Sequence, residues 1–303
     1  MAISGATYSS QHYKYLDAVP ALPGSAMEMS NRTLNPTATT RVSIQWDNEP
    51  PEERTSTLVL TAPSGIFVDL RIFADDIPSV SNAHELQSSS AIDWAFAGLA
   101  FAKSNPYDAP LTDNSWIHWL DSREVDALSV RDTGVSSTLP NGDTRERGEM
   151  KDASGALRVY EEVWRDVRVE PTCVTTPTTT AVFIRFRDGS EAATRGVCVR
   201  VEDINPVDVC GVLVRMGRWC QGVLRDVHGF TAERWELQLT EGTSETECWR
   251  PIFRSGLGYI PCIQACTSPL SSGQEEALDF SAPDGIWKRV ELYETASNSN
   301  SRD

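Results

Sequence analysis

The sequence has no long apolar run and no basic leader segment. Its longest apolar stretch, Ala95 to Ala102, is far shorter than the ~20 residues that a membrane-spanning helix needs. Residues 1–20 contain no basic patch followed by an apolar segment, so no signal peptide is predicted. We therefore expect no membrane insertion and a location in the cytoplasm, or in both cytoplasm and nucleus.

Positive charge is also scarce. The chain has 27 Lys and Arg against 43 Asp and Glu, which gives a formal net charge of -16. Binding to nucleic acid rests largely on cationic contacts with phosphate, so neither nucleic acid nor an anionic membrane is an expected partner. We interpret the acidity as an aid to solubility, and the sequence leaves the oligomeric state open.

Motifs for nucleotide binding, hydrolysis and metal binding are missing. The sequence contains no G-x-x-x-x-G-K-[ST], no G-x-G-x-x-G between a strand and a helix, and no G-x-S-x-G. The four histidines show no metal-ligand spacing, and among the seven cysteines only Cys262 and Cys266 lie close together. We favour reduced thiols over a metal or redox site, and we predict neither a cofactor nor a metal.

Strand signals fill most of the remaining sequence. Residues 57–61 and 66–73 alternate in polarity on either side of the turn Ala62-Pro63-Ser64-Gly65, which predicts a hairpin. Similar strand signals, bounded by turn-forming residues, occur at 116–120, 157–169, 181–186, 197–201, 209–216, 234–239 and 286–293. The pattern predicts an all-β protein.

The strands fall into two similar halves on either side of a Thr- and Pro-rich stretch. Tryptophans recur at matching places in the halves, where Trp94 corresponds to Trp219, Trp119 to Trp235 and Trp164 to Trp287. We predict two related β-barrels, because closing a sheet removes the exposed edges of many short strands. The expected organisation is a flexible segment 1–40, a first barrel 41–170, a linker 171–180, a second barrel 181–295 and a disordered tail 296–303.

Several of these segments resemble the fungal Hri family. The specific runs are Trp94-Ala95-Phe96-Ala97-Gly98 and Gly217-Arg218-Trp219-x-Gln221-Gly222, within a resemblance that extends from Glu52 to Glu294. The resemblance implies two consecutive lipocalin-like (calycin-like) antiparallel barrels and an association with a casein-kinase-I-type kinase. It implies no catalytic residues. The chain departs from the family in a longer N-terminal segment and in the loop 126–146.

An eight-stranded barrel can enclose one small ligand, so polar residues on its strands are candidates for chemistry. The catalytic candidates are His118, Glu162 and Arg218. A lumen-facing His118 could act as acid or base, although we favour a rim or surface position. Glu162 could be a general acid, although we favour a structural ion pair with Arg71, Arg165 or Arg218.

Arg218 keeps two interpretations open, an anchor for an anionic group or a salt bridge that closes the barrel. The predicted ligand-binding residues are Trp94, Phe96, Trp119, Trp164, Trp219 and Gln221. Tryptophans at repeated positions are more often part of the core than of a binding site.

Two functional hypotheses follow. The first is a barrel that binds a small apolar molecule and steers a cofactor-independent isomerisation or cyclisation. The second is a non-enzymatic interaction protein of a casein-kinase-I-type kinase, for which Thr240 to Glu247 places hydroxyls among acidic residues. We favour the first.

Overall fold

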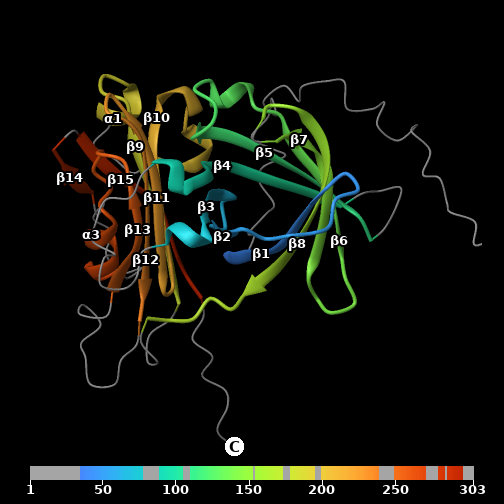
Figure 1. Ribbon diagram of the computed structural model, residues 1–303. Coiled ribbons are helices and arrows are strands. Elements are labelled where there is room, and N and C mark those ends of the chain that lie inside the picture. Colours follow the sequence, from blue (N-terminus) through green and yellow to red (C-terminus); the bar gives the residue numbers. More distant parts are fainter. Residues whose placement is uncertain are drawn as a thin grey trace, which may run out of the picture. The chain divides into compact units, whose positions relative to one another are not determined.

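The chain forms two antiparallel sheets, and the first closes on itself (Figure 1). This computed structural model describes residues 35–77, 89–104, 110–152, 154–172, 178–194, 199–238, 249–270, 279–283 and 285–295. The acidic segment 240–247 of the kinase hypothesis and the predicted tail 296–303 lie outside these residues, as do residues 1–34 of the predicted flexible segment 1–40. Residues 37–40 of that segment belong instead to the first strand.

The closed barrel contains eight strands, each paired with the next along the chain, and β8 pairs back with β1. The strands are β1 (Thr37–Trp46), β2 (Thr55–Thr61), β3 (Ile66–Phe73), β4 (Ile92–Ser104), β5 (Thr112–Asp121), β6 (Asp132–Thr138), β7 (Thr144–Lys151) and β8 (Leu157–Val167). Closure pairs Thr39 with Asp166 and Trp46 with Tyr160. No strand of the barrel is left with an open edge, which such short strands would otherwise expose.

The second sheet is a curled half-barrel of seven strands in the order β13-β12-β11-β10-β9-β15-β14. The strands are β9 (Thr179–Phe186), β10 (Val209–Met216), β11 (Trp219–Asp226), β12 (Gly229–Leu237), β13 (Trp249–Ser255), β14 (Phe280–Ala282) and β15 (Gly285–Glu294). The predicted fold class, an all-β chain of two consecutive lipocalin-like antiparallel barrels, is confirmed, and the second of the two is a curled half-barrel.

Helical segments in the described residues are short. They are α1 (Glu191–Thr194), α3 (Cys262–Thr267) and the 3-10 turns η2 (Ala74–Asp76), η4 (Ser89–Ala91), η5 (Ala127–Ser129), η6 (Val201–Asp203) and η7 (Pro206–Asp208). The predicted strand 197–201 is wrong at its described residues, 199–201. Residues 199 and 200 have no regular structure, and Val201 begins η6. In the part of the chain that the structure describes, no helix is long and apolar enough to cross a membrane.

The predicted hairpin is confirmed as β2 and β3, with Leu60 opposite Val68. Its turn depends on Gly65, which has a φ of +88°, a region that residues with a Cβ rarely adopt. A Cβ at this position would also lie 2.7 Å from the carbonyl oxygen of Ala100. Both constraints favour glycine at residue 65.

The outer face of this hairpin packs against the second sheet. Leu58, Leu60, Val68 and Leu70 are at most 6% exposed and share one core with side chains of β9 and β10 such as Val212. Each such side chain contributes ~1.5–3 kcal/mol when fully buried. Barrel and half-barrel therefore share an apolar core.

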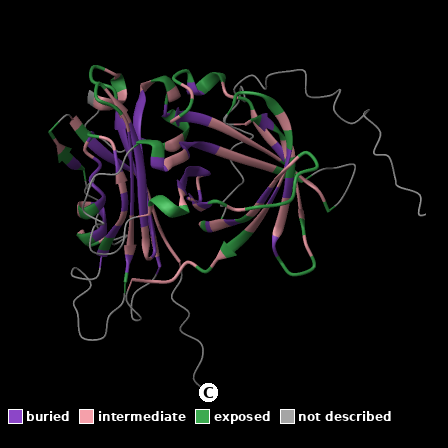
Figure 2. Ribbon diagram, viewed as in Figure 1, coloured by how far each residue is buried: buried purple, intermediate pink, exposed green. Residues whose placement is uncertain are grey.

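Helix α3 lies on the opposite face of the half-barrel, away from the closed barrel (Figure 1). Its side chains Cys262, Ala265 and Cys266 are buried with Leu213 and Trp287 in a separate core cluster. Every residue of β10 is buried as a result, because both faces of the strand are covered (Figure 2).

Polar side chains of the half-barrel reach across the shared core to the barrel. Gln221 Nε2 donates to the carbonyl oxygens of Leu58 (2.9 Å) and Val68 (2.8 Å), and its Oε1 accepts a hydrogen bond from Arg234. The Arg234 guanidinium donates in turn to the carbonyl oxygens of Ser56 and Leu70. Burial lowers the pKa of Arg234 to about 10. This junction satisfies polar groups that an apolar contact would leave unpaired.

Candidate functional site

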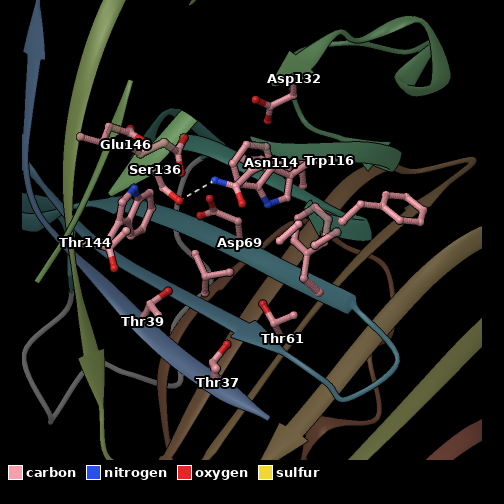
Figure 3. Close-up of a pocket in the computed structure, with 18 of the residues that line it drawn as sticks. Thr37, Thr39, Thr61, Asp69, Asn114, Trp116, Asp132, Ser136, Thr144 and Glu146 are labelled. Atoms are coloured by element: carbon pink, nitrogen blue, oxygen red, sulfur yellow. Dashed lines mark hydrogen bonds between the residues drawn. The ribbon is translucent and has the colours of Figure 1, made fainter. Parts of the chain in front are cut away.

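The interior of the closed barrel contains a cavity of about 280 Å³ (Figure 3). Its aromatic walls are Phe67, Trp94, Phe96, Phe101, Trp116, Tyr160 and Trp164. Hydroxyl and amide groups line it at Thr37, Thr39, Thr61, Asn114, Ser136 and Thr144, and charged groups at Asp69, Arg71, Asp132, Glu146, Glu162 and Asp166. The volume lies at the lower end of the ~300–1,000 Å³ common for ligand sites.

The cavity extends from a solvent-exposed rim to a buried floor. Thr37 at the start of β1 and Asp166 near the end of β8 are exposed, whereas Arg71, Glu146 and Glu162 are buried. Asn114 Nδ2 donates to Ser136 Oγ at 2.9 Å between the rim and the floor (Figure 3).

Strand alternation explains why this interior is polar. Successive side chains of a strand point to opposite faces, so Phe67, Asp69 and Arg71 of β3 point into the barrel while Val68 and Leu70 point to the second sheet. The apolar face of the hairpin is thus outside the barrel, where the second sheet covers it. The inward face is free to carry charge.

Two arginines and three carboxylates form the first half of the floor. Arg41 donates to Glu162 (2.6 Å) and Glu53 (2.7 Å), and Arg71 donates to Glu162 (3.1 Å) and Asp69 (2.9 Å). Both arginines contact the same oxygen of Glu162, which holds strands β1, β3 and β8 together. Buried charges are tolerated in proteins when they are paired and hydrogen-bonded in this way.

The Arg71 guanidinium also faces three rings of the cavity wall. It lies 5.1 Å from the ring centroid of Trp94, 5.4 Å from that of Phe96 and 5.7 Å from that of Trp164. A cation within ~6 Å of a ring centroid is attracted by the negative face of the ring. The aromatic walls therefore already stabilise one cation.

His118 forms the second half of the floor and is fully buried. Its Nδ1 lies 2.8 Å from Asp121 and its Nε2 lies 3.0 Å from Asp132, while its ring stacks on Phe96 at a centroid distance of 4.3 Å. Burial opposes the charged imidazole, but the two aspartates prevail and raise the pKa of His118 to about 9. At neutral pH the ring is an imidazolium that is held on both nitrogens.

Glu146 differs from the other floor carboxylates. The Tyr160 hydroxyl donates to its Oε1 at 2.8 Å, and among the described residues no cationic side chain contacts it. Burial and the nearby charge of Glu162 raise the pKa of Glu146 well above its usual value. Gly134 lies alongside, where a Cβ would approach Glu146 Oε1 to 3.0 Å. Glu146 thus lines the cavity as a buried carboxyl group whose surroundings favour its protonated form.

Four of the predicted site residues meet in this barrel. Glu162, Trp94, Phe96 and Trp164 line the cavity, and Glu162 pairs with Arg71, one of the three partners considered. The favoured rim or surface position of His118 is wrong, because the bulge between β4 and β5 and the two aspartates place it inside. It lies beneath the cavity rather than in its lining.

The other predicted site residues lie elsewhere. Trp119 is buried in the shared core, Trp219 is half-buried on β11, and Gln221 joins the two sheets. Arg218 forms a 2.6 Å ion pair with Glu170 and donates to the carbonyl oxygen of Pro171, so it does not reach the cavity. These residues do not share a site with Glu162, because their strands belong to the second sheet or their side chains face it.

Sequence reasoning missed several floor residues, notably Arg41, Asp69, Asp132, Glu146 and Tyr160. Asp69 stands inside an apolar alternating strand, where a charge at an expected buried position is a detectable signal. Arg41 and Glu162 are 121 residues apart, and no local pattern links them. Their pairing follows only from closure of β1 on β8.

The cysteines of the half-barrel form no site with the cavity. Cys220, Cys262 and Cys266 are buried free thiols in the cluster around α3. Burial acts to raise the pKa of Cys220, but hydrogen bonds from the other two thiols outweigh burial and lower this pKa to about 5. No group of three or more metal-binding side chains occurs among the residues that the structure describes.

Fold and site together define a closed antiparallel barrel with a charged, aromatic-walled cavity, backed by a half-barrel. Residues 37–291 match the family model described as Protein HRI1, and the chain belongs to this family. The predicted family resemblance is confirmed.

A solved structure supports the same fold. The crystal structure of an uncharacterized protein from Saccharomyces cerevisiae is similar to this chain with a TM-score of 0.55 and 18% identity, over 85% of this chain and 99% of that chain. At this identity the similarity shows the fold alone. A comparison with curated protein sequences found no match.

Proposed function

We propose that the closed barrel binds one small molecule in its cavity. The observation that carries this proposal is an internal cavity with aromatic walls and a buried charged floor, reached from a rim of hydroxyl and amide groups. Ligand sites are typically concave and mostly apolar, with a few converging polar groups that fix orientation. The aromatic walls suit the planar or apolar body of a ligand.

The barrel would also catalyse a reaction of the bound molecule. A cofactor-independent isomerisation or cyclisation needs a proton donor against the ligand. Glu146 lines the cavity and burial raises its pKa well above the usual value, whereas His118 does not line the cavity. His118 is the weaker candidate because both of its nitrogens are held by aspartates.

Native mass spectrometry tests the proposal. The full chain, purified gently from the organism that makes it, is expected to carry a stoichiometric small molecule that is lost on denaturation. Ser136→Trp should abolish this mass difference because the indole fills the cavity. The neighbouring Ser137→Trp points to the other face of β6 and should retain it.

A bare wild-type chain, or an S136W variant that still carries the molecule, would refute binding in the cavity. Thermal unfolding of both variants controls for misfolding. The kinase-interaction hypothesis stays a prediction, since its acidic segment 240–247 lies outside the described residues.

A further inference from the structure

The barrel floor carries more carboxylates than cations. Its cationic side chains are Arg41, Arg71 and His118, and its carboxylates are Glu53, Asp69, Asp121, Asp132, Glu146 and Glu162. Each of the three cations is already paired with two carboxylates. A ligand with an anionic group would therefore find no unpaired cation among these floor residues.

Glu146 is the carboxylate without a cationic partner. It is 8% exposed and lines the cavity, and only its Oε1 has a hydrogen-bond partner among the described residues, the Tyr160 hydroxyl. Its Oε2 is left for a ligand. The charged groups that act on it from neighbouring strands are Glu162, Asp132 and Arg71.

The surroundings of Glu146 also suit a cation. Asp132 lines the cavity, and its described contact is with His118 at the floor. Trp116 and Tyr160 add ring surface beside these carboxylates. Carboxylates combined with aromatic faces are the usual chemistry of ammonium recognition, through charge-assisted hydrogen bonds and cation–π attraction.

We infer that the cavity selects a small arylalkyl amine, whose ammonium group donates to Glu146 and whose ring packs against the aromatic walls. This inference rests on the proposed ligand-binding function and names its ligand class. The ammonium favours the ionised form of Glu146, whose pKa burial and Glu162 raise in the empty cavity, so amine binding releases a proton to the extent that Glu146 is protonated. Affinity for the amine therefore rises with pH through the range in which Glu146 titrates.

Three probes of equal size separate charge from shape. 2-Phenylethylamine, 2-phenylethanol and phenylacetate carry positive, neutral and negative groups on the same ring. Isothermal titration of the full chain at pH 7.5 should show the amine binding at least about tenfold more tightly than the alcohol, with phenylacetate the weakest. Titration in two buffers of different ionisation enthalpy measures how many protons are released on binding.

Glu146→Gln supplies the site-specific test. The glutamine keeps an oxygen for the Tyr160 hydroxyl, so the variant should fold, yet it should lose about tenfold or more in amine affinity and release no proton. Its affinity for the alcohol should not change. Glu161→Gln is the matched control, since Glu161 pairs with Arg147 outside the barrel.

The amine preference is overturned if the alcohol or phenylacetate binds as tightly as the amine, if none of the three binds, or if E146Q leaves the amine affinity unchanged. A neutral or acidic molecule found by native mass spectrometry would overturn the preference while leaving the ligand-binding function standing. A copurifying amine that is lost in E146Q but kept in E161Q would support both.

Discussion

The inward face of the closed barrel and the concave face of the half-barrel carry opposite chemistry. The barrel directs Asp69, Arg71 and Glu162 inward around a cavity, whereas the half-barrel buries Phe183, Leu213 and other apolar side chains under α3. The first interior is hollow and charged, and the second is filled and apolar.

The comparison shows where each sheet obtains its stability. The half-barrel has apolar cores on both faces of β10, so its strands are held by packing. The barrel has its larger apolar core on the side that faces the half-barrel, and its interior is held by ion pairs together with a smaller cluster of mostly aromatic side chains around Phe67 and Phe96. The closed barrel can therefore contain a cavity, because the apolar cores of the half-barrel supply much of the stability of the folded chain.

Removing an arginine from the barrel floor should have the largest effect. Arg71→Leu leaves buried Asp69 with no cationic partner among the described residues and Glu162 with Arg41 alone, and we expect it to lower the free energy of unfolding by about 3–5 kcal/mol. Arg147→Leu breaks an exposed pair with Glu161 and should cost at most about 1 kcal/mol. Urea unfolding measures both, and equal losses would contradict the ion-pair account of the barrel.

Truncation of side chains should distinguish the filled interior from the hollow one. Leu213→Ala opens a void in the packed half-barrel and should cost about 2–5 kcal/mol, whereas Met150→Ala enlarges a cavity that already exists and should cost clearly less. The same urea experiment gives both values. A larger loss for M150A would mean that the barrel interior is packed rather than hollow.

Stability should depend on pH through His118. Its pKa is raised from 6.5 to about 9 in the folded chain, so the imidazolium contributes stability that is fully present below about pH 6.5. This contribution, up to about 3 kcal/mol, is lost as the pH rises through about 9. Unfolding measured between pH 6 and 10 should show the loss in the wild type and a flatter profile in His118→Gln, and parallel profiles would disprove it.

The smallest of these effects concerns the junction between the sheets. Gln221→Leu removes the donor that serves the carbonyl oxygens of Leu58 and Val68 and should cost about 1–3 kcal/mol. It should also weaken the coupling between barrel and half-barrel. Unfolding followed by tryptophan fluorescence and by circular dichroism should then separate into two transitions, while a single unshifted transition would show that the apolar core alone joins the sheets.

Much of the fold could be predicted because its signals are local. Alternation and turn chemistry predicted the β2–β3 hairpin, and the recurrent Trp and Gly runs indicated the family. Part of the site also followed, since Glu162 and Trp164 lie two residues apart and share the inward face of β8.

The repeated tryptophans show the limit of such patterns. Trp164 and Trp287, paired by sequence, both point to the interior of their own sheet, but Trp94 faces the cavity while Trp219 faces the junction. The repeated sequence pattern predicts that a tryptophan recurs, but it does not predict which face of the sheet that tryptophan occupies. A bulge such as that in the β4–β5 pairing at Ala97 and Gly98 changes the face on which the following residues lie.

The sequence by itself determined the all-β class, the main strands and the family, because these depend on neighbours within a few residues. Only the tertiary structure decided which face of each strand became an interior. Closure of β1 on β8 brought Arg41 to Glu162, and the return of the chain from β5 to β6 brought Asp132 to His118. The charges of the floor are stable only in that enclosed arrangement, since pairs within one strand, such as Asp69 with Arg71, are completed by partners that other strands supply.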